Sequence, residues 1–208
     1  LEYIRQLPFQ DAPDAFGMHP NANITCAMNE TREILGTALS LQPREAGGAG
    51  KSWGDVVGEL ALGCEKSLPE QLDLDQCLID FPIKYEESMN TVLSQEMLRF
   101  NDLTVIVKRS LFTIQKAVKG LVVLSNELEA MGNSMFNGAV PGMWMAAAYP
   151  SRMPLGSWTK DLVARLKFIN DWFESKSYPS CYWVSGFYFT QAFLTGTKQN
   201  YARRSRQP

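Results

Sequence analysis

Residues that commonly carry chemistry are scarce in this sequence. Its 208 residues include one histidine, His19, and four cysteines, at positions 26, 64, 77 and 181. A multi-histidine metal site is therefore excluded, and any histidine-based catalytic triad would have to use His19. The cysteines are far apart and form no C-x-x-C pair. This spacing argues against a structural zinc site and indicates free thiols in a reducing compartment.

The sequence also lacks a long apolar run and a surplus of positive charge. No stretch approaches the ~20 apolar residues of a membrane-spanning helix, and no charged start followed by an apolar run marks a signal peptide. The net charge of −2 gives no electrostatic support for nucleic-acid binding, and we interpret the arginines at 203, 204 and 206 as a solvated tail. With 45% hydrophobic and 20% charged residues, the composition is globular. We expect a soluble intracellular protein with no nucleic-acid and no membrane partner.

Apolar residues recur at steps of three and four over about thirty residues in the middle of the sequence. They are Met89, Leu93, Phe100, Leu103, Val107, Leu111, Ile114 and Val118. This period predicts an amphipathic helix over about residues 88–119, with Ser88 as its N-cap and Gly120 as its stop. Glu96 is the one polar residue that interrupts the apolar face. Such a helix would be ~45 Å long at ~1.5 Å per residue.

Weaker patterns predict further helices, whereas strand-like alternation is scarce. The expected helices after the long one cover residues 121–136, 157–173 and 185–203. Two starts are expected earlier: Ser52 and Asp55 form a capping-box pattern, and Asn29 caps a helix that runs to residue 39 with Ile34, Leu35 and Leu39 inward. The predicted fold is mainly α, a multi-helix bundle with one long helix.

Residues 47–52, Gly-Gly-Ala-Gly-Lys-Ser, are similar to part of a phosphate-binding loop. The full pattern needs a glycine where Glu45 stands, and a carboxylate there would repel phosphate. The preceding residues, 37–44, are typical of a helix end with a proline rather than of the buried strand that delivers such a loop. We interpret the segment as a surface loop that opens the helix capped by Ser52.

The other candidates for chemistry have structural interpretations. His19, which a proline follows, is expected to make a hydrogen bond within a turn. Glu86 with Glu87, and Asp73 with Asp75, precede predicted helices, where attraction to the positive helix N-terminus contributes ~0.3–1 kcal/mol each. We therefore predict no catalytic, cofactor-binding or metal-binding residue in this protein.

The densest feature of the sequence is an aromatic string near its end. Residues 183–196 read Trp-Val-Ser-Gly-Phe-Tyr-Phe-Thr-Gln-Ala-Phe-Leu-Thr-Gly, and Gln-Asn-Tyr-Ala-Arg follows at 199–203. This much aromatic surface is rarely left in water on a monomer. We expect Trp183 and Phe187 to be buried anchors against a large surface, with Gly186 permitting close approach of a helix.

Both strings resemble the C-terminal region of axonemal dynein heavy chains. Other strings resemble that family in the same order: Phe16-Gly-Met-His-Pro-Asn-Ala-Asn-Ile24, Leu39-Ser-Leu-Gln-Pro-Arg44, Tyr85-Glu-Glu-Ser-Met-Asn-Thr-Val-Leu93, Lys119-Gly-Leu-Val-Val123, and Tyr149-Pro-Ser151 with Pro154-Leu-Gly-Ser-Trp158. Ordered agreement of several motifs over residues 1–203 is more specific than any one of them. The Phe-Tyr-Phe-Thr-Gln-Ala-Phe-Leu-Thr-Gly version is more similar to inner-arm chains than to cytoplasmic or outer-arm chains.

The resemblance implies a place within a larger motor. Residues 1–81 would follow the lid of the sixth AAA+ module, and residues 82–208 would be the helical part of the C-terminal domain, without the β-rich segment that follows in relatives. The parent would be an ATP-driven, minus-end-directed microtubule motor, with ATP and Mg²⁺ bound in other parts of it. This region would pack on the AAA+ ring and couple module motions without chemistry of its own.

The resemblance also implies partners and a location. The partners are the rest of the ring in cis and microtubules through the parent protein, with dynein intermediate and light chains as further candidates. The expected location is the cytoplasm and cytoskeleton, in the axoneme of a cilium or flagellum.

Two alternatives of other classes stay open on the sequence alone. An independent nucleotide-hydrolysing enzyme would use Lys51 and Ser52, and saturable ATP binding that Lys51→Ala abolishes would reveal it. A stand-alone helical adaptor would bind partners through its aromatic helix and would be a soluble, well-folded monomer. The motor interpretation instead predicts marginal solubility or self-association of the isolated 208 residues, since the last helix lacks a downstream partner.

Overall fold

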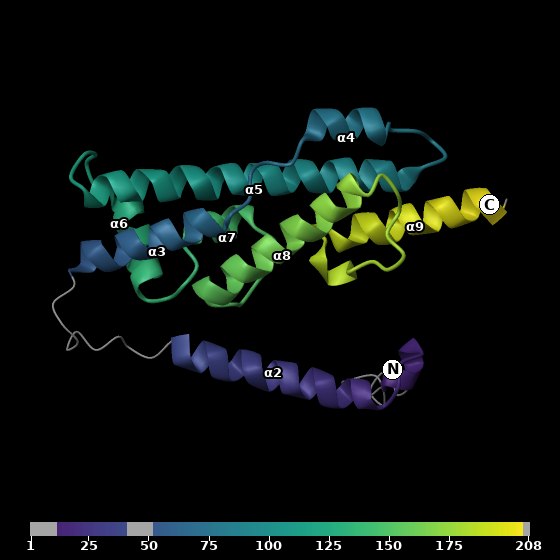
Figure 1. The fold of residues 1–208 in the computed structure, drawn as a ribbon, viewed down its shortest axis with the longest axis horizontal. Coiled ribbons are helices and arrows are strands. Elements are labelled where there is room, and N and C mark those ends of the chain that lie inside the picture. The colour runs from purple at the N-terminus through teal and green to yellow at the C-terminus, as the bar shows by residue number, and fades with distance from the viewer. Residues whose placement is uncertain (1–11, 41–51, 206–208) are drawn as a thin grey trace, which may run out of the picture. The chain divides into compact units, whose positions relative to one another are not determined.

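The computed structural model describes residues 12–40 and 52–205. The protein forms two compact units, residues 1–42 and 43–208, and each is described by itself. Every regular element in the described ranges is a helix, and none is a strand (Figure 1). The prediction of a mainly α fold is therefore confirmed.

The first unit contains the 3₁₀ helix η1, Pro13–Phe16, and the helix α2, Asn21–Ser40. The backbone N–H of Asn21 donates to Nδ1 of His19 at 3.2 Å, so the sole histidine makes the predicted local turn bond. The prediction that Asn29 caps a helix is wrong, because α2 already begins at Asn21. Ile34 and Leu35 are 68% and 58% exposed, so neither turns inward within this unit.

The second unit is built around one long helix. α5 spans Ser88–Val118, 31 residues, as the apolar period predicts (Figure 1). Gly120 follows it with a φ of 73°, and its N–H and that of Leu121 satisfy carbonyls of the last turn, which confirms Gly120 as the stop. Ser88 is not the N-cap: Glu87 holds that position, without a side-chain capping bond.

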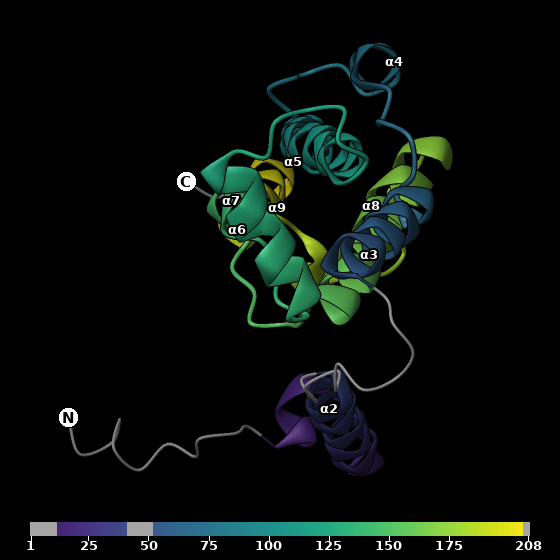
Figure 2. The same cartoon turned by 90° about the vertical axis from the view of Figure 1, so that its left-hand side faces the viewer.

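Within residues 52–205, seven further helical elements surround α5. They are α3 Trp53–Ser67, α4 Leu74–Asp80, α6 Asn126–Phe136, α7 Gly142–Ala147, α8 Leu155–Glu174, η2 Val184–Gly186 and α9 Thr190–Ser205. In the view roughly along α5, α3 and α8 lie to one side and α6 and α7 to the other (Figure 2). The apolar side chains that the period assigns to α5 are at most 6% exposed from Met89 to Ile114, so the predicted apolar face is the buried one.

Several helix starts differ from the predicted ones. α3 has the predicted capping box, in which Ser52 and Asp55 bond each other's backbone N–H groups. α8 also matches, with the predicted face of Trp158, Leu162, Leu166, Ile169 and Trp172 buried. α6 begins at Asn126 rather than at residue 121, because the Ser125 hydroxyl caps it. α9 begins at Thr190 rather than at residue 185, since η2 and an extended link precede it.

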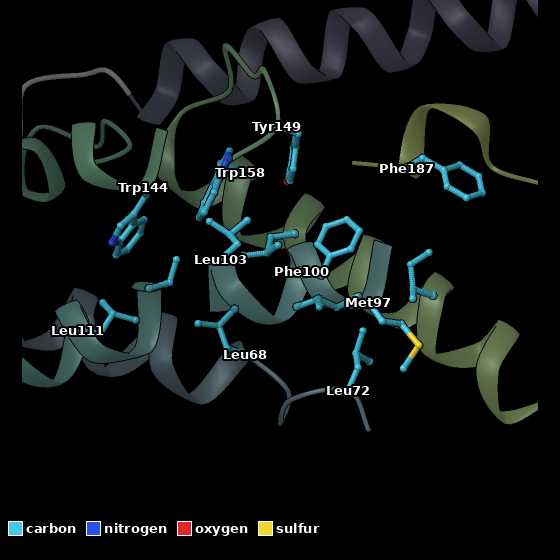
Figure 3. Close-up of a cluster of buried hydrophobic side chains, with 14 of the residues drawn as sticks. Leu68, Leu72, Met97, Phe100, Leu103, Leu111, Trp144, Tyr149, Trp158 and Phe187 are labelled. Carbon is cyan, nitrogen blue, oxygen red and sulfur yellow. The ribbon is translucent and has the colours of Figure 1, made fainter. Parts of the chain in front are cut away.

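Aromatic side chains fill the centre of the second unit. The rings of Trp144 and Trp158 stack with centroids 5.5 Å apart, and Tyr149 stacks on the other side of Trp158 at 6.4 Å (Figure 3). The indole N–H of Trp144 donates to Oγ of Ser110 on α5 at 2.8 Å, which satisfies its one polar atom in the core. Phe100 of α5 meets Tyr149 edge-on at 6.4 Å.

The compact unit of residues 43–208 includes helices from both sides of residue 81. α3 and α4 pack on α5, and the Asn101 side chain of α5 exchanges two 2.8 Å hydrogen bonds with the backbone of Leu72. This packing does not test the assignment of residues 1–81 to the end of a module lid. That assignment stays a prediction.

Candidate functional site: the aromatic segment and its ties to α5 and α8

The aromatic string folds into a link and a helix that the core only partly covers. We call residues 183–189, which contain η2 and precede α9, the aromatic segment. Phe187 and Phe193 are 2% and 7% exposed and stack with centroids 4.6 Å apart. Trp183, Phe189 and Tyr201 keep 37%, 48% and 66% of their surface in water. The expected burial is therefore confirmed for Phe187, whereas Trp183 is only partly buried within these 208 residues.

Glu96 of α5 ties down the end of the aromatic segment. Its side chain is fully buried, and its carboxylate accepts the backbone N–H groups of Phe189, at 3.0 Å, and of Tyr188. These donors lie directly before α9, where the positive end of the helix favours an anion. Burial raises the pKa of Glu96, while the two backbone bonds and Arg99 act in the opposite direction. Glu96, the one polar residue on the apolar face of α5, thus accepts two backbone N–H groups that would otherwise be unpaired.

Arg165 of α8 holds the same segment from another side. Its Nη1 donates to the carbonyl of Ser185 at 2.6 Å, and its Nε donates to Asp161 at 2.7 Å. The guanidinium carbon lies 4.0 Å from the ring centroid of Tyr149 and 5.4 Å from that of Trp183. Both side chains of the Arg165–Asp161 pair are nearly buried. A planar cation with several donors can make all these contacts at once.

Tyr149 completes this arrangement. Its hydroxyl donates to the Asp161 carboxylate at 2.8 Å, beside the bond from Arg165. Burial, and then the neighbouring Asp161, raises the pKa of the Tyr149 hydroxyl, so this phenol stays a protonated donor. The hydroxyl of Tyr188 donates to the carbonyl of Ala147, which joins the aromatic segment to the end of α7.

The last helix is tied to the first turn of α5. Asn200 accepts the backbone N–H of Ser88 at 2.9 Å, and Gln199 accepts the Ser88 hydroxyl at 2.8 Å. Arg203 donates to the same hydroxyl at 2.5 Å, with its guanidinium 4.2 Å from the ring of Tyr85. The interpretation of Arg203 as part of a solvated tail is therefore wrong. Arg204 is exposed, and residue 206 lies outside the described residues.

A glycine allows α9 to approach α5 closely, although it is not the one that the sequence indicated. A Cβ on Gly196 would lie 3.0 Å from Cγ2 of Val92 on α5. Gly186 instead lies under the ring of Trp183, where a Cβ would stand 2.5 Å from Cε3. Gly186 therefore makes room for an indole within its own segment, and Gly196 makes room for a helix.

The residues considered for chemistry are not brought together. Asp73 caps α4 by accepting the N–H of Gln76 at 2.9 Å, as expected for a carboxylate at a helix start. Glu87 accepts from the amide of Asn90 at 2.9 Å. Of the phosphate-loop candidate, residues 47–52, residues 47–51 lie outside the described residues, and Ser52 is the N-cap of α3. In the parts of the protein that the structure describes, no group of three or more His, Cys, Asp or Glu is placed to hold a metal ion.

Two further findings concern thiols and membranes. The four cysteines are free, and burial raises the pKa of Cys77 to about 11, which makes that thiol a poor nucleophile. Of the helices that the structure describes, none is both long and apolar enough to span a bilayer.

The sequence did not predict that Glu96 and the Arg165–Asp161 pair hold the aromatic segment in place. A glutamate inside an otherwise apolar helix face is a recognisable signal that a buried partner exists, but it does not name the partner. The Asp161 and Arg165 spacing of four residues is common on exposed helix surfaces, so it gave no sign of a buried pair. The polar residues at 199, 200 and 203 are typical of an exposed helix surface. Their shared partner, Ser88, lies more than a hundred residues earlier, so the local sequence does not indicate it.

Comparison with known proteins identifies the family. The family model for the C-terminal domain of dynein heavy chains matches residues 28–208. The sequence is 50% identical over 204 residues to human dynein axonemal heavy chain 3, 48% identical over 204 residues to rat dynein axonemal heavy chain 1, and 45% identical over 206 residues to mouse dynein axonemal heavy chain 12. Each match covers 98% of this sequence but only 5%, 4% and 7% of the respective relative. The protein belongs to the family of C-terminal domains of dynein heavy chains.

Proposed function

We propose that this protein is the helical part of the C-terminal domain of an axonemal dynein heavy chain, and that it is a mechanical element of an ATP-driven, minus-end-directed microtubule motor. It would pack on the AAA+ ring in cis and couple the motions of ring modules. Its own residues would carry out no chemistry. ATP and Mg²⁺ would bind in other modules, and microtubules would be engaged through the parent protein. The family membership and the axonemal names of the relatives support this proposal.

The observation that carries the mechanical role is the double tie between α5 and α9. Glu96 binds the start of α9 and Ser88 binds its last turns, so the two helices run antiparallel, and α9 is joined near both of its ends to the N-terminal third of α5. These ties are about 12 Å apart along α5 at ~1.5 Å per residue. Two helices fixed at separate points cannot slide independently, and a displacement of one is transmitted to the other.

The finer assignments rest on the resemblance alone. We propose an inner-arm heavy chain in the cytoskeletal axoneme of a cilium or flagellum, with residues 1–81 as the end of the sixth-module lid. The Phe187-Tyr188-Phe189-Thr190-Gln191 string supports the inner-arm type. Dynein intermediate and light chains are further candidate partners.

A substitution at the helix contact tests the mechanical role. Gly196→Val in the full-length motor would force α9 away from Val92, because a Cβ already lies 3.0 Å from it. We expect slower gliding of microtubules while basal ATP turnover is kept. Gly63→Val is the matched control, since a Cβ at that exposed helical glycine meets no atom within 4 Å. Equal gliding velocities for the two variants would refute a coupling role for this contact.

A further inference from the structure

The outer face of α5 carries a row of side chains that the rest of the second unit leaves at least partly exposed. Three apolar members, Leu98, Val105 and Phe112, recur every seven residues and are 48%, 44% and 53% exposed. A seven-residue repeat of apolar side chains is typical of the seam along which two helices pack side by side. Polar and charged residues lie between and beyond them on the same face. We call the following residues the outer stripe: Gln95, Leu98, Asp102, Val105, Arg109, Phe112 and Lys116.

The two charges nearest the centre of the outer stripe have no ion-pair partner among the residues that the structure describes. Asp102 and Arg109 are both exposed, and the ion pairs recorded within residues 52–205 use other side chains. A face with apolar side chains and free charges of both signs suits a partner that carries the opposite charges at matching positions.

The outer stripe itself has this matching pattern when it is read in reverse. Leu98 and Phe112 lie seven positions to either side of Val105, which is ~10 Å along the helix at ~1.5 Å per residue. Asp102 lies ~4.5 Å before Val105, and Arg109 lies ~6 Å after it. Two antiparallel copies of α5, related by a two-fold axis at Val105, would therefore place Leu98 opposite Phe112 of the other copy. The same arrangement places Asp102 opposite Arg109 of the other copy, twice.

We propose that a second copy of this protein binds the outer stripe and forms an antiparallel, two-fold dimer. A two-fold interface uses the same patch on both partners, which a self-complementary pattern permits. A parallel dimer would instead oppose Asp102 with Asp102 and Arg109 with Arg109, and like charges in contact disfavour it. One helix face from each copy makes a small interface, so the dimer is weak and forms at high protein concentration. The proposal does not depend on the proposed motor function.

Sedimentation equilibrium of the 208-residue protein tests the dimer. We expect the weight-average mass to rise from that of the monomer toward twice that value as the concentration is raised to about 1 mM. Val105→Glu places two like charges at the two-fold axis and should weaken the association at least about tenfold. Leu194→Glu on α9 is the matched control, because Leu194 is 45% exposed and lies outside the outer stripe. A wild-type protein that stays monomeric, or an association that Leu194→Glu weakens and Val105→Glu does not, would overturn the proposal.

A charge exchange tests the antiparallel orientation. Asp102→Arg gives each copy two arginines, and Arg109→Asp gives each copy two aspartates, so each variant alone should associate about tenfold more weakly than the wild type. An equal mixture of the two variants restores both opposite-charge contacts in a mixed dimer and should recover the wild-type association. Circular dichroism checks that each variant keeps the helix content of the wild type. A mixture that associates no better than the separate variants would contradict the pairing of Asp102 with Arg109.

Discussion

The carboxylate of Glu96 accepts the backbone N–H of Phe189 at 3.0 Å, and this contact joins the N-terminal third of α5 to the start of α9. It is the inner of two ties between these helices; the outer one joins Ser88 to Asn200. Residues that are ninety or more positions apart in the sequence thereby hold one another in place. Substitutions at these and neighbouring contacts measure how much each contact contributes to the stability of the fold.

Removal of the Glu96 carboxylate should destabilise the compact unit. Glu96→Ala leaves two buried backbone donors without an acceptor, and each unpaired donor costs about 1–3 kcal/mol. We expect the free energy of unfolding of the 208-residue protein, measured by denaturant titration, to fall by about 2–4 kcal/mol in total. Glu96→Gln keeps one acceptor oxygen and should lose less. An equal loss in the two variants would contradict this, because glutamine keeps both the volume of the side chain and one acceptor oxygen.

The same residue predicts a pH dependence with an unusual sign for a carboxylate. Burial raises the folded-state pKa of Glu96 above its ordinary value of 4.5, so the folded state binds this proton more tightly than the unfolded state. The stabilisation of the folded state that results from this raised pKa is then fully present below about pH 4.5. It is lost as the pH rises through the raised pKa. Relative to Glu96→Gln, the wild-type protein should lose stability from pH 4.5 upward. If the wild type instead becomes more stable relative to Glu96→Gln as the pH rises above 4.5, the hydrogen bonds to the charged carboxylate outweigh the effect of burial on its pKa.

Gly132 of α6 should not tolerate a methyl group. A Cβ there would lie 2.5 Å from Cζ2 of Trp53, whose indole is held by a 3.1 Å bond to Asn133 and cannot swing aside freely. We expect Gly132→Ala to lower the free energy of unfolding by about 1–3 kcal/mol, the usual cost of overpacking. Gly63→Ala, at an open helical position, should instead raise it by about 0.5–1 kcal/mol through helix propensity. Destabilisation of similar size by both would contradict the Trp53 contact.

The two predicted aromatic anchors should differ in the isolated 208-residue protein. Phe187 is 2% exposed, and Phe187→Ala should cost about 3–5 kcal/mol. Trp183 is 37% exposed, so Trp183→Ala should cost only about 1–2 kcal/mol. In the full-length motor, where the outer face of Trp183 would be covered, we expect its cost to approach that of Phe187. Thermal or denaturant unfolding of both proteins checks this, and an unchanged small cost in the motor would show that this face stays in water.

The parts of the fold that sequence analysis predicted correctly depend on local chemistry. The end of α5 follows from the left-handed conformation of Gly120, the start of α3 from the reciprocal bonds of Ser52 and Asp55, and α8 from a regular apolar period. α4 and α7 have seven and six residues, which is too short for a period to be evident. In α2, Ile34 and Leu35 of the predicted apolar face are exposed within this unit, since a pattern predicts a face but not what covers it.

The site itself was predicted only in outline. The aromatic string indicated burial, and Phe187 and Phe193 confirm it. The roles of Glu96, Arg165 and Gly196 depend on partners 20 to more than 100 residues away. Long-range pairing of this kind leaves no local signature, because each of these residues is also common on ordinary helix surfaces. Only the three-dimensional arrangement shows that they act on one short segment.

The stall force of single full-length motors measured in an optical trap tests the mechanical account most directly. Glu96→Ala releases the inner tie between α5 and α9 without touching any residue considered for nucleotide binding. The account predicts a lower stall force for this variant, with unloaded microtubule-stimulated ATP turnover equal to that of the wild type. A wild-type stall force in the variant, or a fall in ATP turnover that by itself accounts for a lower force, would contradict the claim that this region carries load rather than chemistry.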